Sequence, residues 1–510
     1  MSIRLCGGWL VSSPRPLTAL LTLATLLVPS GFALRSPRPQ ASLTAHPPLA
    51  QRQESLNLAA GRLDYQVTAG FVPLAGEGPA TASVYYTAYT QTPAPGEPPR
   101  PLAIAFNGGP GASSLYLHLL GLAPQRLALD AEGRVLPGSP HLRDNPDTWL
   151  AFTDLVFVDP PGTGFSDLGY PHQTERYLDV YGDVQGLREF LRRYLQKTGR
   201  QESAIYLVGE SYGGTRAVLL AWDQVQEPEF DLQGLILISP VLDYEFLDPR
   251  ASSNLKLALA LPTWAATARY HARITPTRPW DAWLASIEDW AIRQYLPALV
   301  QGDRLTDSQR QTLARQLGRY TGLSSQQFLR QDLRLTTEQF RRVLLAGRQL
   351  DRWDSRLTYT TIPPSEHMEG AMLEAWSNYA REHLGLPGDY VLFSRRVNQS
   401  WRWGNQPFNL DLAPQLGETL RRRPGLRLFV AAGYYDLVVP FAAVHYSLNR
   451  LNLPPQQHET QVHLRYYAAG HMVYLPDRER QRLQQEVAAF MAAATAGGDR
   501  PTLLLPPASP

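Results

Sequence analysis

The sequence contains a single cysteine, Cys6, among its 510 residues. One thiol can form no intramolecular disulfide, no thiolate zinc site and no CxxC redox pair. Lysine is scarce too, since Lys197 and Lys256 are the only two and arginine supplies the remaining basic charge. The formal net charge is only +2. This near-neutrality excludes the strong positive field that nucleic-acid binding requires, and we expect no nucleic-acid partner.

Metal and nucleotide motifs are missing as well. The sequence contains no HExxH pair, no cysteine cluster, no EF-hand loop and no G-x-x-x-x-G-K-[ST] phosphate loop. We therefore predict an activity that uses neither a metal ion nor an organic cofactor. Hydrophobic residues make up 44% of the chain, which is enough for a large buried core, and the 11 Trp and 24 Tyr argue against disorder.

The one segment apolar enough to enter a membrane lies at the N-terminus. Arg4 and Arg15 carry positive charge, and Leu17 to Val28 form an apolar run too short to span a bilayer comfortably. Gly31 and Ala33 then offer small side chains at the −3 and −1 positions of a cut after Ala33. We predict a signal peptide over 1–33 and an exported protein, periplasmic or secreted, with no membrane span after signal removal. An uncleaved anchor and a wrongly assigned start codon are the alternatives.

The remaining chain divides by composition. Residues 34–60 are rich in Pro, Ser, Gln and Ala and are predicted to form a flexible leader. A strand-rich core is expected over 61–248 and again over 386–495. The strand signal fades between them, over 249–385. The tail, 496–510, is rich in Pro and Leu and is expected to be flexible.

Eight short segments carry strand patterns. Two of them combine β-branched and aromatic residues with partial alternation, as antiparallel strands do: Leu63–Ala69 and Ala82–Thr90. Six are short and mostly apolar, as strands buried on both faces of a parallel sheet are: Pro101–Phe106, Asp154–Val158, Ala204–Val208, Leu235–Ile238, Leu426–Ala431 and Val462–Tyr467. We therefore predict an α/β fold with a mostly parallel central sheet and helices on both faces.

Helical signals replace strand signals in residues 249–385. Three capping boxes occur there: Thr306 with Gln309, Ser324 with Gln327, and Thr336 with Gln339. Apolar residues between Trp280 and Ala291 recur at helical spacing. We predict a helical cap inserted between core strands. The tryptophan stripe either packs into the cap or lines a binding cleft, and packing is the favoured reading.

Gly209-Glu210-Ser211-Tyr212-Gly213 is a G-x-S-x-G sequence between a predicted strand and a predicted helix. A sharp strand-to-helix turn of this kind lifts the serine hydroxyl out of the sheet, and the glycines avoid clashes that side chains would make. This context predicts that Ser211 is a nucleophile. The alternative is a tight turn with an unreactive serine.

A serine nucleophile needs a base, and the base needs an orienting acid. In α/β-hydrolases these follow in the order Ser, acid, His. Asp436 and His471 each stand just after one of the last two predicted strands, so the chain keeps this order. Taken singly, Asp436 could be a turn or N-cap residue and His471 one of 11 histidines. The ordered set of three predicts an α/β-hydrolase fold with a Ser211–Asp436–His471 triad.

The glycine-rich loop Asn107–Gly111 follows the first of the apolar strands. In this fold such a loop supplies one oxyanion donor, and the residue after the nucleophile supplies the other. A plain turn is the alternative, since GGPG is also turn chemistry.

The chain resembles the serine carboxypeptidase family (peptidase family S10), especially its bacterial members. Four segments carry the resemblance, which spans roughly residues 60–490: Asn107–Ser114, Val158–Ser166, Gly209–Gly214 and Gly470–Val473. The stretch Tyr434–Asp436 is similar to the acid-bearing loop of bacterial members.

The resemblance implies roles for particular residues. Ser211 would be the nucleophile, His471 the base and Asp436 its partner. The backbone N–H groups of Gly109 and Tyr212 would form the oxyanion hole. Substrate-carboxylate binding would fall to three more residues: Asn107, Gly108 and Glu210. The segment 159–166 would shape the floor of the site.

Three positions depart from the pattern of many family members. Ala112 stands where a cysteine is common, which agrees with a form free of disulfides. Gly121 matches the position of a second glutamate that pairs with the first, and Ala105 that of a tryptophan.

The predicted function is that of an exported carboxypeptidase that cleaves C-terminal peptide bonds through an acyl-enzyme. Peptide or protein C-termini would be its partners. Two alternatives remain: an esterase or acyltransferase that uses the same triad, and a catalytically inactive binding protein of hydrolase fold.

Overall fold

The computed structural model describes residues 49–495 apart from 75–81, 93–95, 97–98, 170–173, 248–252, 277, 387–388 and 404–409. The predicted signal peptide and C-terminal tail lie outside the described residues, as do residues 34–48 of the predicted leader. Among the residues described, no helix is both long and apolar enough to cross a membrane.

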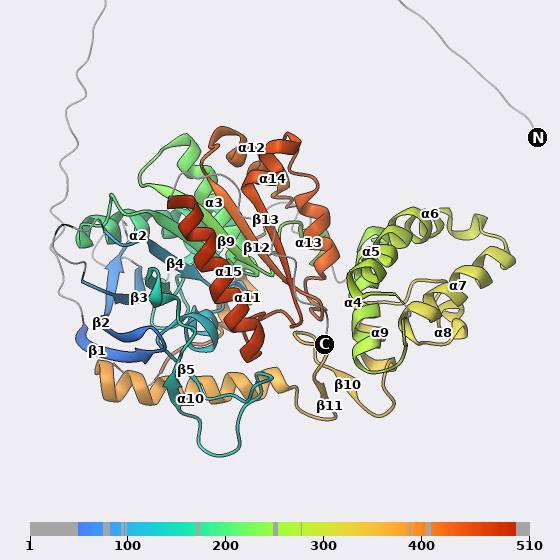
Figure 1. Cartoon of the computed structure of the whole chain (residues 1–510), viewed down its shortest axis with the longest axis horizontal. Helices are drawn as coiled ribbons and strands as arrows, with labels where there is room; N and C mark the ends of the chain where they lie inside the picture. The colour runs from blue at the N-terminus through green and yellow to red at the C-terminus, as the bar shows by residue number, and fades with distance from the viewer. Residues whose placement is uncertain are drawn as a thin grey trace, which may run out of the picture. The chain divides into compact units, whose positions relative to one another are not determined.

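A nine-stranded sheet forms the centre of the molecule, in the order β1-β2-β3-β7-β4-β8-β9-β12-β13 (Figure 1). Its strands are β1 Ala50–Leu58, β2 Gly61–Pro73, β3 Ser83–Thr90, β4 Leu102–Phe106, β7 Asp154–Val158, β8 Ile205–Glu210, β9 Leu232–Ile238, β12 Arg427–Gly433 and β13 Val462–Tyr467. Four short strands form two small ribbons: β5 Gln125–Leu127 with β6 Leu142–Asp144, and β10 Gln349–Leu350 with β11 Thr358–Tyr359.

The sheet is parallel from β7 to β13 and antiparallel from β1 to β7. All eight predicted strands are present, and this mostly parallel sheet with flanking helices is the α/β-hydrolase fold that we predicted. The carboxyl ends of β4, β8, β12 and β13 therefore lie on one edge of the sheet. Ligands of open α/β sheets bind at this edge, and each predicted site residue follows one of these strands except Glu210, which ends β8.

Fifteen α-helices are described. Those of the core are α1 Leu115–Leu117, α2 Val180–Thr198, α3 Tyr212–Gln226, α10 Pro364–Leu384, α11 Arg395–Ser400, α12 Ala413–Arg422, α13 Phe441–Leu448, α14 Pro455–Gln461 and α15 Asp477–Thr495. Between α3 and α10 come α4 Asn254–Tyr270, α5 Trp280–Trp290, α6 Leu296–Gln301, α7 Asp307–Thr321, α8 Ser325–Arg330 and α9 Thr337–Val343.

Alternation along each strand divides the core between the two faces of the sheet. On β4, Ile104 and Phe106 join the cluster that includes α2, α3, α12 and α13, whereas Ala103 and Ala105 join the cluster that includes α10 and α15. All four side chains are fully buried. The apolar runs in the sequence follow from this burial on both faces.

Helices α4 to α9 lie between β9 and β12 in the chain, where we expect the insertion, and are drawn in green and yellow in Figure 1. The three predicted capping boxes are present at the starts of α7, α8 and α9. Trp283 and Ile287 of α5 are buried in the larger apolar cluster, which confirms that this face packs. Helix α4 contacts both α5 and α7 within the insertion and α13 of the core.

Helix α10 departs from the expected cap. We assigned 249–385 to the insertion, but Met372 and Trp376 of α10 pack in the same cluster as Tyr89 and Phe157 of the sheet. Figure 1 shows α10 running along the core, away from α4 to α9. This part of the assignment is wrong, because the apolar stripe of α10 covers one face of the sheet.

The predicted leader, 34–60, is also wrong in its last part. Residues 50–58 form β1, which pairs with β2 as an antiparallel hairpin. Only Leu56 of β1 is buried. A polar edge strand of this kind has the composition of a loop, because just one of its side chains is fully buried.

Candidate active site

Ser211 occupies the turn between β8 and α3. Its backbone angles are φ 58° and ψ −122°, a conformation that costs a non-glycine residue about 1–3 kcal/mol. Three hydrogen bonds hold it: its N–H donates to Ile238 at 3.0 Å, and its carbonyl accepts from Gly214 at 3.0 Å and from Val241 at 3.2 Å. The chain therefore presents this serine in the strained turn that the motif predicts.

The flanking glycines are required by close backbone approach. A Cβ on Gly209 would lie 2.2 Å from the Gly213 carbonyl oxygen, and one on Gly213 would lie 2.3 Å from that of Phe106. Real side chains do not pack at such distances. The turn thus seats directly against the end of β4, where the glycine-rich loop begins.

His471 and Asp436 are brought together from the ends of β13 and β12. Nδ1 of His471 donates to Oδ2 of Asp436 at 2.6 Å, and both side chains are buried. Oδ1 of Asp436 accepts the N–H groups of Val438 at 2.8 Å and Val439 at 2.9 Å. These bonds fix the carboxylate, and the carboxylate fixes the imidazole tautomer.

The position of His471 is also set by its backbone. Its N–H donates to the Trp353 carbonyl at 2.6 Å, and its carbonyl accepts from the Ser239 hydroxyl at 2.7 Å. Among the described residues its Nε2 has no hydrogen-bond partner. Burial lowers the pKa of His471, but the charge and hydrogen bond of Asp436 outweigh burial and raise it above its usual value.

The glycine-rich loop lies against the serine turn. A Cβ on Gly108 would lie only 2.5 Å from the Tyr212 nitrogen and 2.8 Å from the Glu210 carbonyl oxygen. Gly109 has a φ of +104°, in the region that favours glycine. The two predicted oxyanion donors, Gly109 and Tyr212, thus belong to segments in direct contact.

Glu210 and Asn107 are joined as well. Nδ2 of Asn107 donates to Oε1 of Glu210 at 3.0 Å, and the Asn107 amide oxygen accepts from the Leu117 N–H at 3.0 Å. The hydroxyl of Tyr474 donates a short hydrogen bond to Oε2 of Glu210. Burial raises the pKa of Glu210 to about 7. The charge of His471 and the two hydrogen-bond donors lower this pKa but do not outweigh burial.

A buried ion pair braces the loop from beneath. Arg216 of α3 contacts Asp183 of α2 at 2.7 Å and also donates to the Asn107 carbonyl. The Arg216 guanidinium lies over the Tyr212 ring at 4.8 Å. Burial raises the pKa of Asp183, and the charge of Arg216 opposes that rise. The pair thus touches both segments that carry the predicted oxyanion donors.

The segment after β7, which the resemblance implies as the floor of the site, is tied to the glycine-rich loop through Ser114. Asp159 is buried, and its Oδ1 accepts the Ser114 N–H at 3.0 Å and the Tyr390 hydroxyl at 2.9 Å. Burial raises the pKa of Asp159 to about 7. A Cβ on Gly164 would collide with this carboxyl group.

The family-model match covers residues 59–491 and is described as serine carboxypeptidase. This match takes in every strand of the central sheet except β1, the insertion and every residue of the candidate site. The chain belongs to the serine carboxypeptidase family.

Curated relatives match over shorter stretches. Serine-type carboxypeptidase F of Aspergillus niger is 31% identical over 183 residues, which are 35% of this chain and 31% of that protein. Serine carboxypeptidase-like 2 of Arabidopsis thaliana is 29% identical over 196 residues, which are 36% of this chain and 42% of that protein. The chain thus matches between about a third and two fifths of the length of these relatives.

A solved structure extends the likeness to most of the fold. The prohormone-processing carboxypeptidase of Saccharomyces cerevisiae aligns with a TM-score of 0.55 at 17% identity. The alignment covers 84% of this chain and 91% of that one. At this identity the likeness concerns the fold.

Sequence reasoning missed several residues of the site. The Asp183–Arg216 pair and Tyr474 lie outside every motif that we considered. Tyr474 comes three residues after His471, but a lone tyrosine behind a histidine motif carries no recognisable signal. The sequence does give one signal nearby. Gly121 departs from the family pattern, and the Tyr474 ring lies against Gly121.

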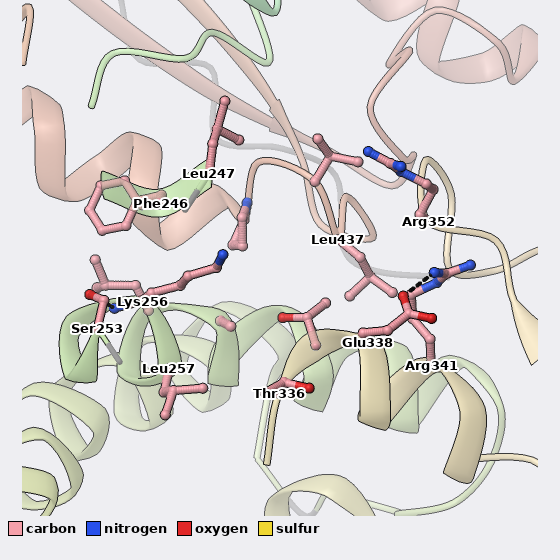
Figure 2. A pocket seen from close by; sticks show the side chains of 16 residues that line it. Phe246, Leu247, Ser253, Lys256, Leu257, Thr336, Glu338, Arg341, Arg352 and Leu437 are labelled. Atoms are coloured by element: carbon pink, nitrogen blue, oxygen red, sulfur yellow. Dashed lines mark hydrogen bonds and ion pairs between the residues drawn. The ribbon is translucent and has the colours of Figure 1, made fainter. Parts of the chain in front are cut away.

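A cavity of about 420 Å³ lies between the insertion and the core. It is lined by Lys256 of α4, by Glu338 and Arg341 of α9, and by Leu437 beside Asp436 (Figure 2). Figure 2 also shows Arg352 at the side of the cavity. The next residue, Trp353, packs on His471, with their ring centroids 4.8 Å apart. The cavity therefore adjoins the segments that hold the histidine and its acid.

The described part of the chain contains no group of three or more His, Cys, Asp or Glu side chains placed to hold a metal ion.

Proposed function

We propose that the protein is a serine carboxypeptidase that hydrolyses C-terminal peptide bonds through an acyl-enzyme on Ser211. One observation supports the proposal. The hydrogen-bonded His471–Asp436 pair lies close enough for its charges to act on Glu210, which is hydrogen-bonded to Asn107 and directly precedes Ser211 in its strained turn. The first pair suits proton transfer, and the second suits recognition of a terminal carboxyl group.

In the acylation step, Oγ of Ser211 attacks the carbonyl carbon of the last peptide bond. Its proton passes to Nε2 of His471, which Asp436 stabilises once it is charged. The N–H groups of Gly109 and Tyr212 bind the oxyanion. The C–N bond then breaks, and His471 gives its proton to the departing amino group.

Deacylation repeats these roles with water as the nucleophile. His471 takes a proton from the water as its oxygen attacks the acyl carbon, and the proton returns to Oγ of Ser211 when the ester bond breaks.

Asn107, Gly108 and Glu210 bind the substrate's terminal carboxyl group. The cavity of Figure 2 would receive a substrate side chain.

The deciding comparison uses a blocked dipeptide and its C-terminal amide. We expect hydrolysis of the free acid at a rate at least tenfold above that of the amide, because only the acid engages Asn107 and Glu210. Equal rates would favour the esterase or acyltransferase alternative. A fluorophosphonate probe separates these enzymes from an inactive binding protein, which would leave Ser211 unlabelled.

We further propose that the protein is exported, on the strength of the N-terminal apolar run and the small residues before position 34. The N-terminal sequence of the protein recovered from a periplasmic or secreted fraction tests this. Cleavage after Ala33 is expected, and recovery of uncleaved protein in the cytoplasm would contradict it.

A further inference from the structure

Glu210 holds one hydrogen-bond donor on each carboxyl oxygen. Asn107 donates to Oε1 at 3.0 Å, and the Tyr474 hydroxyl donates to Oε2. Glu210 is only 4% exposed, and Tyr474 is fully buried. Two donors on opposite oxygens fix the plane of the carboxyl group. A third partner can then bind Glu210 through its remaining lone pairs or, when the carboxyl group is protonated, through its O–H.

The Tyr474 ring occupies space that Gly121 leaves open. A Cβ on Gly121 would lie 2.8 Å from Cγ and 3.0 Å from Cδ2 of Tyr474. Gly121 belongs to a turn of π-helix, His118–Leu122, which follows the glycine-rich loop and α1. Any larger residue at 121 would push the ring away, so Gly121 and Tyr474 are matched in shape.

The other ionisable groups that act on Glu210 come from three elements. The charge of His471, after β13, favours the ionised form of Glu210, and that of Asp436, after β12, opposes it. Tyr116 of α1 also feels the charge of Glu210, but its hydroxyl donates to Glu369 of α10 at 2.9 Å. Within the described structure, Tyr474 is therefore the phenol that holds Glu210 directly.

We propose that Tyr474 is a positioning residue, which holds the Glu210 carboxyl group in place to receive the terminal carboxyl group of the peptide. The inference rests on the proposed function, since it assigns a task to the same pocket. Burial raises the pKa of Tyr474 well above its usual value. The phenol consequently remains a donor at every pH at which His471 can act as a base.

The Tyr474 hydroxyl has an effect opposite to that of burial. A hydrogen bond to the carboxylate favours the ionised form, so removal of the hydroxyl raises the pKa of Glu210 further. A neutral Glu210 accepts a substrate carboxylate, whereas an ionised Glu210 repels it. Without the phenol oxygen, peptide binding should therefore persist to higher pH. At the optimum pH, however, the peptide should bind more weakly, because the Glu210 carboxyl group is less constrained.

The test is Tyr474→Phe, assayed across pH on two substrates of the same acyl group. One is a blocked dipeptide with a free carboxyl group, and the other is an alkyl ester with none. We expect the alkaline limb of kcat/KM for the dipeptide to move up by about one pH unit, since one hydrogen bond to a charged group has about this effect. The ester profile should keep its position.

Tyr116→Phe is the matched control, because it removes a phenol oxygen that is bonded to Glu369 instead. Its dipeptide limb should stay at the wild-type position. Gly121→Ala should shift the limb in the same direction as Tyr474→Phe, since its methyl group displaces the ring. Glu210→Gln combined with Tyr474→Phe should show no alkaline limb at all.

The possible outcomes separate this inference from the function on which it rests. If the wild-type enzyme hydrolyses both substrates but Tyr474→Phe does not move the alkaline limb of kcat/KM for the dipeptide, the inference alone is overturned. An equal loss on dipeptide and ester would do the same, because it would show a merely structural role. If the wild-type enzyme hydrolyses the ester but not the dipeptide, or hydrolyses neither, the proposed function is refuted and the inference with it.

Discussion

Nδ1 of His471 lies 2.6 Å from Oδ2 of Asp436, across the ends of the adjacent parallel strands β12 and β13. The same carboxylate accepts two backbone N–H groups through its other oxygen. This arrangement holds the imidazole with its proton on Nδ1, so that Nε2 can act as the base that we propose.

Removal of either residue should therefore stop catalysis with the fold preserved. We expect His471→Ala to lower kcat on the order of 10⁶-fold. Asp436→Asn should lower it about 10⁴-fold, because an amide favours the wrong imidazole tautomer. Steady-state kinetics on a blocked dipeptide checks both values, with circular dichroism as the control for folding. A variant within tenfold of the wild type would remove that residue from the mechanism.

Glu210 should make peptide hydrolysis fall at high pH. Its pKa is raised to about 7, so it is neutral below that pH and ionised above it. Repulsion between two carboxylates then weakens peptide binding as pH rises. Glu210→Gln should flatten this fall in kcat/KM for peptides, because an amide donates without titrating. Superimposable peptide and ester profiles in the wild type would contradict this role.

Asp159 should make stability depend on pH. Its folded pKa of about 7 exceeds the usual 3.8. Between these values the folded state keeps a proton that the unfolded state releases, so the free energy of unfolding falls as pH rises. The contribution amounts to at most about 4 kcal/mol. In urea unfolding, Asp159→Asn should gain stability relative to wild type from pH 4.5 to 7.5. A constant difference would count against this account.

The buried pair beneath the glycine-rich loop should matter far more than exposed pairs. Asp183→Ala leaves Arg216 buried and uncompensated, which should cost about 3–5 kcal/mol. Arg62→Ala breaks an exposed pair with Asp64 and should cost no more than about 1 kcal/mol. Denaturant titrations measure both, and similar losses in the two variants would show that the pair does not brace the loop.

Chelators should leave activity unchanged. The proposed reaction uses a serine, a histidine and backbone donors, none of which needs a metal ion. Dialysis against a chelator, followed by assay on a blocked dipeptide, checks this. Loss of activity that one added divalent metal restores would overturn the prediction.

The centre of the sheet could be predicted from sequence because β4, β7 and β8 are buried on both faces and thus read as apolar runs. Ser211 was visible for a similar reason, since the geometry of its turn dictates glycines at 209 and 213. By contrast, β1 could not be recognised. Its single buried residue, Leu56, leaves a polar segment that resembles a linker.

The remaining misses concern contacts between distant segments. Helix α10 reads as one more helix of the insertion, and only packing against Tyr89 and Phe157 assigns it to the core. Tyr474 and Glu210 are 264 residues apart, so no local pattern joins them. The match between Gly121 and the Tyr474 ring likewise exists only in three dimensions.

The most direct test of the account is a C-terminal digestion ladder read by mass spectrometry. A mixed set of peptides is incubated with wild-type enzyme, in parallel with the same peptides bearing C-terminal amides and with the Ser211→Ala variant. The account predicts stepwise loss of C-terminal residues from the free acids, little from the amides and none with the variant. Internal cleavage, equal trimming of acids and amides, or a full ladder from Ser211→Ala would contradict it.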